Sequence, residues 1–106
     1  MVNRFDIYLV NHDAQPSADA KNTRPCVVIS PDEMNNNIGH VMIAPLSSAS
    51  AEYPTRIKVE FLNSTRLVVL DQIRTVDKVR LVKKIGSVDK DRHGEILRCL
   101  GELFAE

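Results

Sequence analysis

Polar side chains stand at the ends of three apolar stretches of the chain, and their chemistry suits the binding of an anionic group. Arg24 directly precedes one such stretch, and Ser47 and Asp71 each directly follow another. A guanidinium carries a fixed charge and several donors in a rigid fork. The simpler interpretation, in which each residue only marks where a strand leaves the core, stays open at this point.

The sequence contains no motif that indicates a metal site, a cofactor site or a catalytic cysteine. The histidines, His12, His40 and His93, share no metal-ligand spacing, and no HExxH or clustered Cys/His motif is present. No Gly-x-Ser-x-Gly motif is found, and the four glycines form no phosphate-binding loop. Cys26 and Cys99 lie in or beside apolar segments, which favours buried, reduced thiols. We therefore expect no metal and no cofactor.

The charges balance overall but are unevenly distributed. Residues 1–53 contain three basic and six acidic side chains, and residues 54–106 contain eleven and eight. Five basic residues, opposed only by Asp77, lie within 74–84: Arg74, Lys78, Arg80, Lys83 and Lys84. This cluster permits phosphate binding, but a solvated surface would have the same composition.

The elements that must position these residues are mostly short strands. Residues 55–61 alternate between apolar and charged side chains, which indicates a half-exposed antiparallel strand. Further strands are expected at 6–11, 26–30, 39–46, 66–72 (with 73–76 as a continuation) and 83–88. The connections are expected to be loops at 12–24 and 47–54, a helical turn at 31–37 capped by Ser30, a turn at 62–65 and a short helix at 77–82.

The C-terminal segment has the clearest helical pattern. Apolar residues recur there at the spacing of one helix face: Ile96, Leu97, Leu100, Leu103 and Phe104. Asp89 is a suitable N-cap for this helix. Five or six short antiparallel strands and one C-terminal helix predict a mainly β fold, a small SH3-like barrel with the helix packed on it.

The length and the apolar pattern predict a single cytoplasmic domain. A chain of 106 residues has room for one domain, and we expect it to span residues 1–106. No apolar run approaches the roughly 18 residues that a membrane span needs, and no secretory signal is visible at the start. We therefore expect no contact with a membrane.

Five segments, taken in order, resemble the signature blocks of the MazF/PemK toxins, and the resemblance runs over about residues 5–100. One such block alone would be a weak signal, but five in register are specific. They are residues 6–11 (DIYLVN), 23–28 (TRPCVV), 44–48 (APLSS), 53–55 (YPT) and 70–77 (LDQIRTVD).

The resemblance implies a fold, an activity and partners. The fold would be the SH3-like barrel of the CcdB/MazF type, assembled as a homodimer. The activity would be that of a type II toxin that cleaves single-stranded RNA at short sequences without a metal, leaving a 2′,3′-cyclic phosphate and a 5′-hydroxyl. The partner would be a MazE-like antitoxin whose acidic C-terminal segment covers the RNA groove.

Within this family pattern, two residues are expected to perform the chemistry. Arg24 would stabilise the charge that develops on the phosphate, and Ser47, where the family usually has Thr, would supply the hydroxyl. Single-stranded RNA is bound through phosphates, base edges and stacking. The expected RNA contacts are Lys21, Asn22, Thr23, Ser48, Tyr53, Arg56, Gln72 and Arg74.

The sequence departs from the family pattern at the expected acid and base. Ser17 stands where some members have a loop His, and Val69 where some have an Arg. Asp71 matches the Asp of that scheme, with either a catalytic or a structural role. His12 occupies a place that is usually apolar, and its pKa would suit a general base. The loop block 16–19 is also altered, so cleavage specificity cannot be carried over.

Two alternatives remain at this point. A CcdB-like toxin would poison DNA gyrase, but such toxins depend on a C-terminal Trp-Gly-Ile segment, and this chain has no Trp. A degenerate member of the MazF/PemK family would bind RNA or an antitoxin without cutting. Binding that leaves the RNA intact would identify the second case.

Overall fold

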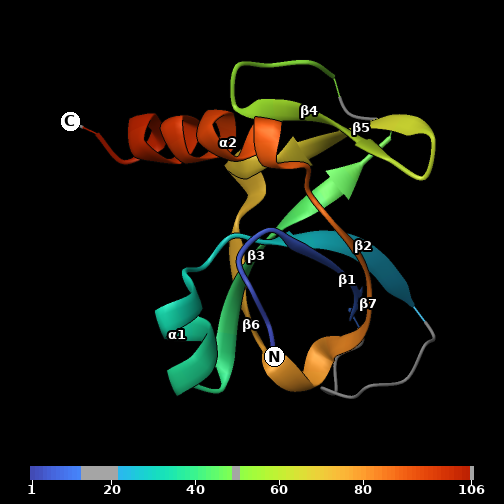
Figure 1. The fold of residues 1–106 in the computed structure, drawn as a ribbon, viewed down its shortest axis with the longest axis vertical. Coiled ribbons are helices and arrows are strands. Elements are labelled where there is room, and N and C mark those ends of the chain that lie inside the picture. Colours follow the sequence, from blue (N-terminus) through green and yellow to red (C-terminus); the bar gives the residue numbers. More distant parts are fainter. Residues whose placement is uncertain (13–21, 49–50, 106) are drawn as a thin grey trace.

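Strands dominate the computed structural model, which describes residues 1–12, 22–48 and 51–105 (Figure 1). Most of the predicted loop 12–24 lies outside these ranges. The elements are β1 (Asp6–Asn11), β2 (Thr23–Val28), α1 (Asp32–Asn37), β3 (His40–Ser47), β4 (Arg56–Phe61), β5 (Ser64–Val69), β6 (Arg74–Asp77), β7 (Leu81–Ser87) and α2 (Lys90–Leu103), with 3₁₀ turns at Leu70–Gln72 and Lys78–Arg80.

Strand β3 connects the two parts of a strongly curled antiparallel sheet. The strands are ordered β4-β5-β3-β2-β1-β7, and β6 also pairs with β3. The first half of β3 pairs with β6, whereas its last two residues, Leu46 and Ser47, pair with β5. The chain thus forms a half-barrel, and α2 packs against β4 and the 3₁₀ turn Leu70–Gln72 (Figure 1). The prediction of a small antiparallel barrel with a C-terminal helix is confirmed.

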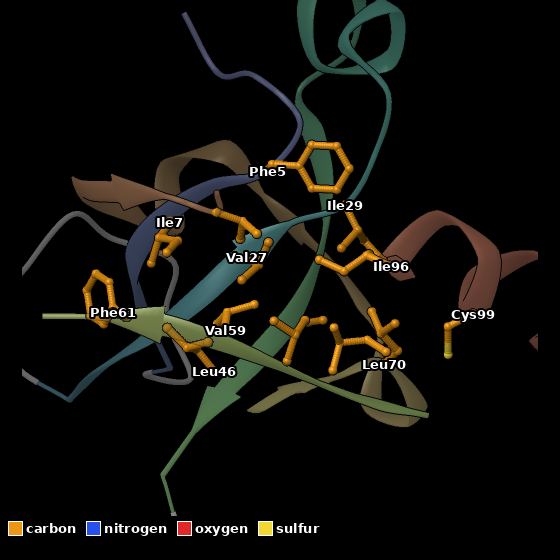
Figure 2. Packing of buried hydrophobic residues seen from close by; sticks show 14 residues of the cluster. Phe5, Ile7, Val27, Ile29, Leu46, Val59, Phe61, Leu70, Ile96 and Cys99 are labelled. Atoms are coloured by element: carbon orange, nitrogen blue, oxygen red, sulfur yellow. The ribbon is translucent and has the colours of Figure 1, made fainter. Parts of the chain in front are cut away.

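The core lies between the curled sheet and α2. Its main cluster combines side chains of β1 to β5, among them Ile7, Val27 and Val59, with Ile96 of the helix (Figure 2). Ile57, Val59 and Phe61 are all buried, as the alternation of β4 predicts. A second, smaller cluster lies beneath the other part of the sheet and consists of Val10, Cys26, Val41, Ile43 and Val76.

The predictions for residues 66–82 are partly wrong. Strand β5 ends at Val69, and the next three residues form a 3₁₀ turn. Because this turn redirects the chain, residues 74–77 do not continue β5 but form β6 against the first half of β3. The helix expected at 77–82 is reduced to the 3₁₀ turn Lys78–Arg80 before β7 begins.

Ser30 does not cap α1, contrary to the prediction. Pro31 occupies the N-cap position. The Ser30 hydroxyl instead donates to Asn35 Oδ1 and accepts a hydrogen bond from the backbone N–H of Met42, at 3.0 Å. Both Ser30 and Asn35 are buried, so this network fixes α1 to β3.

Helix α2 is present as predicted, but its buried face differs from the expected one. Ile96 and Cys99 are buried, and Leu100 packs partly against the core. Leu97 and Phe104 are 41% and 74% exposed, and Leu103 is 36% exposed. Positions i, i+3 and i+4 face the sheet, and the last turn extends past it towards the C-terminus (Figure 1). No helix in the described ranges is long and apolar enough to cross a membrane.

Candidate active-site groove

Antiparallel pairing brings Arg24 and Ser47 to the same edge of the sheet. Strands β2 and β3 are neighbours, and their pairing ends on this side with Cys26 opposite Pro45. Arg24 lies two residues beyond that pair on β2, and Ser47 lies two residues beyond it on β3. Both side chains line a cavity of about 360 Å³. The strands thus bring together the two residues that the sequence predicts to perform the chemistry.

A second cavity, of about 500 Å³, adjoins the first. The two share three lining residues, Arg24, Pro45 and Gln72, so they form two lobes of one groove. We call the first the Ser47 lobe; its other lining residues are Pro25, Leu46, Ser47, Ser48, Arg66 and Val69. We call the second the His12 lobe; its other lining residues are His12, Asn22, Cys26, Ile43 and Arg74.

The groove is lined by three guanidinium groups, those of Arg24, Arg66 and Arg74. None of them forms an ion pair with a carboxylate in the described part of the chain. Uncompensated positive charge in a concave surface attracts anions and concentrates them there. The groove therefore suits an anionic ligand that is long enough to occupy both lobes.

His12 contributes a neutral imidazole to the His12 lobe. Its backbone N–H donates to the Asn22 carbonyl at 3.1 Å. Its Nε2 atom is buried and has no hydrogen-bond partner among the described residues. Burial, followed by the positive charges of Arg74, Arg24 and Arg80, lowers the pKa of His12 below its ordinary value of 6.5. At neutral pH the ring can therefore accept a proton.

The 3₁₀ turn Leu70–Gln72 sends two neighbouring side chains in different directions. Gln72 lines both lobes of the groove. Asp71 instead accepts two hydrogen bonds from Arg56, at 3.2 and 3.1 Å, and one from the Thr55 hydroxyl at 3.0 Å. Arg56 also donates to the Ala51 carbonyl at 2.9 Å. The Asp71 carboxylate is thereby held outside the groove.

A family model described as "PemK-like, MazF-like toxin of type II toxin-antitoxin system" matches residues 3–104. The chain belongs to this family. The resemblance found in the sequence is thus confirmed, and the barrel type expected from it is the fold of this MazF-like toxin.

Individual relatives agree with the family assignment. A Staphylococcus epidermidis protein named "Endoribonuclease MazF" is 28% identical over 106 residues, covering 94% of this chain and 88% of that protein. A mycobacterial endoribonuclease in complex with its cognate antitoxin has a TM-score of 0.80 at 19% identity, covering 96% and 93% of the two chains. A MazE–MazF structure from Deinococcus radiodurans has a TM-score of 0.79 at 22% identity, covering 98% and 95%. At these identities the structural likeness establishes the fold.

Some of the predicted RNA contacts of this MazF-like toxin lie outside the groove. Tyr53 is 57% exposed, and its ring centroid lies 4.6 Å from the guanidinium carbon of Arg56 in the Asp71 cluster. Thr23 pairs with Asn11 in the β1–β2 ladder and does not line either lobe. Lys21 and Ser17 lie outside the described residues. The contacts that do line the groove are Asn22, Ser48, Gln72 and Arg74.

Arg66 lines the Ser47 lobe, although it was not among the predicted site residues. It stands immediately before the apolar stretch 67–70, just as Arg24 stands before its own apolar stretch. That shared position was the available signal. This position alone does not place Arg66 in the groove, because only the pairing of β5 with β3 brings residue 66 beside Ser47.

The cysteines offer no nucleophile, and no metal cluster is found. Burial raises the pKa of Cys26 to about 12, and its thiol donates to the Arg24 carbonyl at 3.8 Å. Cys99 is also buried, and burial raises its pKa. Among residues 1–12, 22–48 and 51–105, no three His, Cys, Asp or Glu side chains lie together as metal ligands would.

The Asp71–Arg56 pair should make stability depend on pH in this MazF-like toxin. Hydrogen bonding from Arg56 lowers the pKa of Asp71 below 3.8, so the native state favours the carboxylate. Such a group stabilises the fold above its unfolded pKa, and this contribution is lost as the pH falls through the native pKa. We expect Asp71→Asn to lower the thermal midpoint at pH 7, and the difference from wild type to shrink below about pH 4.

Thermal unfolding followed by circular dichroism between pH 2.5 and 7 measures this difference. Asp89→Asn removes the same charge from an exposed residue at the start of α2 that makes no side-chain cap hydrogen bond. It should leave the midpoint almost unchanged. A deficit in Asp71→Asn of the same size at every pH would show that ionisation of Asp71 does not contribute.

Proposed function

We propose that this MazF-like toxin is a sequence-specific endoribonuclease that cleaves single-stranded RNA, including mRNA, without a metal. The observation that carries the proposal is the joint presence of Arg24 and Ser47 in one lobe of a positively charged groove. The second lobe of the groove adds His12, which is neutral at pH 7 because burial and nearby arginines lower its pKa. The relative named as an endoribonuclease supports the same activity.

The proposed reaction is an attack by the ribose 2′-hydroxyl on the adjacent phosphate. The neutral His12 imidazole accepts the proton of the 2′-hydroxyl as the new bond from the 2′-oxygen to phosphorus forms. The bond from phosphorus to the 5′-oxygen breaks, and the 5′-oxygen takes up a proton from solvent water, while His12 later releases its proton to solvent. The products are a 2′,3′-cyclic phosphate and a 5′-hydroxyl.

Two residues would stabilise the transition state of this reaction. Negative charge grows on the non-bridging oxygens and on the leaving 5′-oxygen. The Arg24 guanidinium has no carboxylate partner in the described ranges, so its donors are available to that charge. The Ser47 hydroxyl would hydrogen-bond the phosphate and align the 2′-hydroxyl. Asn22, Ser48 and Gln72 would contact bases, and Arg74 a phosphate.

The test is the incubation of the purified protein with a long, unstructured RNA in excess EDTA. Mapping the 5′ ends of the products should reveal cuts at one recurrent short sequence, with 5′-hydroxyl ends. Cleavage that EDTA abolishes would refute metal independence. RNA that is bound but left intact would instead favour a binding module without nuclease activity.

His12 should give the cleavage rate a dependence on pH. The proposed base must be neutral, and its pKa lies below 6.5. We expect kcat/KM to be constant above this pKa and to fall as the pH drops below it. His12→Gln should lower the rate by about 10²–10⁴-fold and remove the acidic limb of the profile.

His40→Gln is the matched control for His12→Gln. His40 is an exposed histidine that pairs with Asp77 at 3.0 Å and does not line either lobe. Its variant should keep the parental rate and pH profile. A His12→Gln protein with the parental profile would show that the base lies elsewhere.

We also propose a MazE-like antitoxin as the protein partner. Arg24, Arg66 and Arg74 form no ion pair among the described residues, and their charges would attract an acidic C-terminal segment, which would cover the groove. Two of the similar structures contain a toxin with its antitoxin. Such a partner should inhibit cleavage when added at equal concentration, and bound antitoxin that leaves cleavage unchanged would exclude this mode of inhibition.

We propose that the toxin without its antitoxin forms a homodimer. We also propose that it acts in the cytoplasm. Leu97, Leu103 and Phe104 are exposed apolar residues on α2 and at its C-terminal end, and a second subunit could cover them. An mRNA substrate would place the protein in the cytoplasm. A molar mass of one chain by light scattering at micromolar concentration would contradict the dimer.

A further inference from the structure

Arg66 and Arg24 both line the Ser47 lobe. Arg66 belongs to β5, opposite Val59 of β4. Its neighbour Leu67 pairs with Ser47 at the end of β3. In the sheet, β3 lies between β5 and β2, so Ser47 has one arginine-bearing strand on each side.

The Arg66 guanidinium is partly positioned, and no carboxylate in the described part of the chain forms an ion pair with it. Its carbon lies 5.8 Å from the centroid of the Phe61 ring, and its Nε lies 3.4 Å from the Ser64 hydroxyl. Neither contact supplies negative charge. Glu60, on the adjoining strand, accepts a hydrogen bond from Thr65 at 2.8 Å and forms no ion pair with Arg66.

Two guanidinium groups that line one cavity repel each other unless an anion lies between or beside them. Arg24 and Arg66 start from strands on either side of β3, so their backbones are about two strand spacings, or roughly 10 Å, apart. Arginines that start this far apart can contact two different phosphates of one chain. The Ser47 hydroxyl lies on the strand between them.

We propose that Arg66 binds the phosphate next to the scissile one, so that single-stranded RNA crosses the end of β3 from Arg24 to Arg66. This inference rests on the proposed nuclease function and extends it by a substrate subsite. A phosphate contact carries no sequence information. Arg66 therefore strengthens the binding of every RNA sequence, whereas discrimination between sequences falls to groups such as Gln72.

The experiment measures RNA binding as a function of salt. The probe is a fluorescein-labelled 12-nucleotide 2′-O-methyl RNA of mixed sequence, which has no free 2′-hydroxyl and cannot be cut. Anisotropy titrations between 50 and 300 mM KCl compare wild type, Arg66→Gln, Arg66→Lys and Arg92→Gln. Arg92 is an exposed arginine of α2, paired with Glu95, so its variant is a control for the loss of one charge.

We expect Arg66→Gln to weaken binding about fivefold or more in 50 mM KCl. The slope of log K against log salt should become shallower by about 0.7, the value for one lost phosphate contact on a single strand. Arg66→Lys should keep the wild-type slope, and Arg92→Gln should match wild type. With cleavable RNA, Arg66→Gln should raise KM by a similar factor at every cut site and leave the cut sequence unchanged.

Three outcomes would overturn the inference. If wild type cleaves RNA and Arg66→Gln matches Arg92→Gln in slope and in KM, Arg66 does not contact the substrate, although the nuclease function stands. If Arg66→Gln changes the cut sequence with no change in slope, Arg66 contacts a base. If wild type neither binds nor cleaves RNA, the proposed function fails, and this subsite fails with it.

Discussion

Replacing Arg24 by alanine should lower the rate of RNA cleavage by at least about 100-fold, the usual loss when one preorganised donor to a developing anion is removed. Arg24 lies where the two lobes of the groove meet and forms no ion pair in the described ranges. Its charge is therefore available to the phosphate as negative charge develops. Because the side chain is exposed, its removal should leave the fold intact.

Single-turnover cleavage with enzyme in excess isolates the chemical step from binding. Arg24→Lys is an informative companion, because it retains the charge but loses the planar fork, and it should fall between wild type and Arg24→Ala. Circular dichroism and thermal unfolding establish that the variants are folded. A folded Arg24→Ala protein that cleaves at the parental rate would remove Arg24 from the mechanism.

Replacing Ile96 by alanine should lower the free energy of unfolding by about 2–5 kcal/mol. Ile96 of α2 is fully buried and belongs to the core cluster, together with Leu70 and Cys99 (Figure 2). The truncation removes apolar contacts and leaves a cavity between α2 and the sheet. Native stability is commonly 5–15 kcal/mol, so the loss is a large fraction of the total.

Equilibrium unfolding in urea measures this difference. Leu62→Ala is the control, since Leu62 is 73% exposed in the turn between β4 and β5. Exposed substitutions of this kind usually change stability by less than about 0.5 kcal/mol. Equal midpoints for the two variants would show that α2 is not anchored through Ile96.

Several features of this MazF-like toxin were determined by the sequence alone. The alternation of Ile57, Val59 and Phe61 specifies a half-buried strand because side chains alternate between the two faces of a sheet. The helical spacing near the C-terminus identifies α2 for the corresponding reason. Arg24 and Ser47 could also be found from local sequence, because each borders an apolar strand within a recognisable block.

The tertiary structure decided the rest. Asp71 and Gln72 are adjacent in sequence, and only the 3₁₀ turn directs Gln72 to the groove and Asp71 to Arg56. Arg66 joins the groove only through the pairing of β5 with β3. These arrangements depend on the register of the strands and on the 3₁₀ turn Leu70–Gln72. Both are selected by burial summed over the whole core, so a single segment does not reveal them.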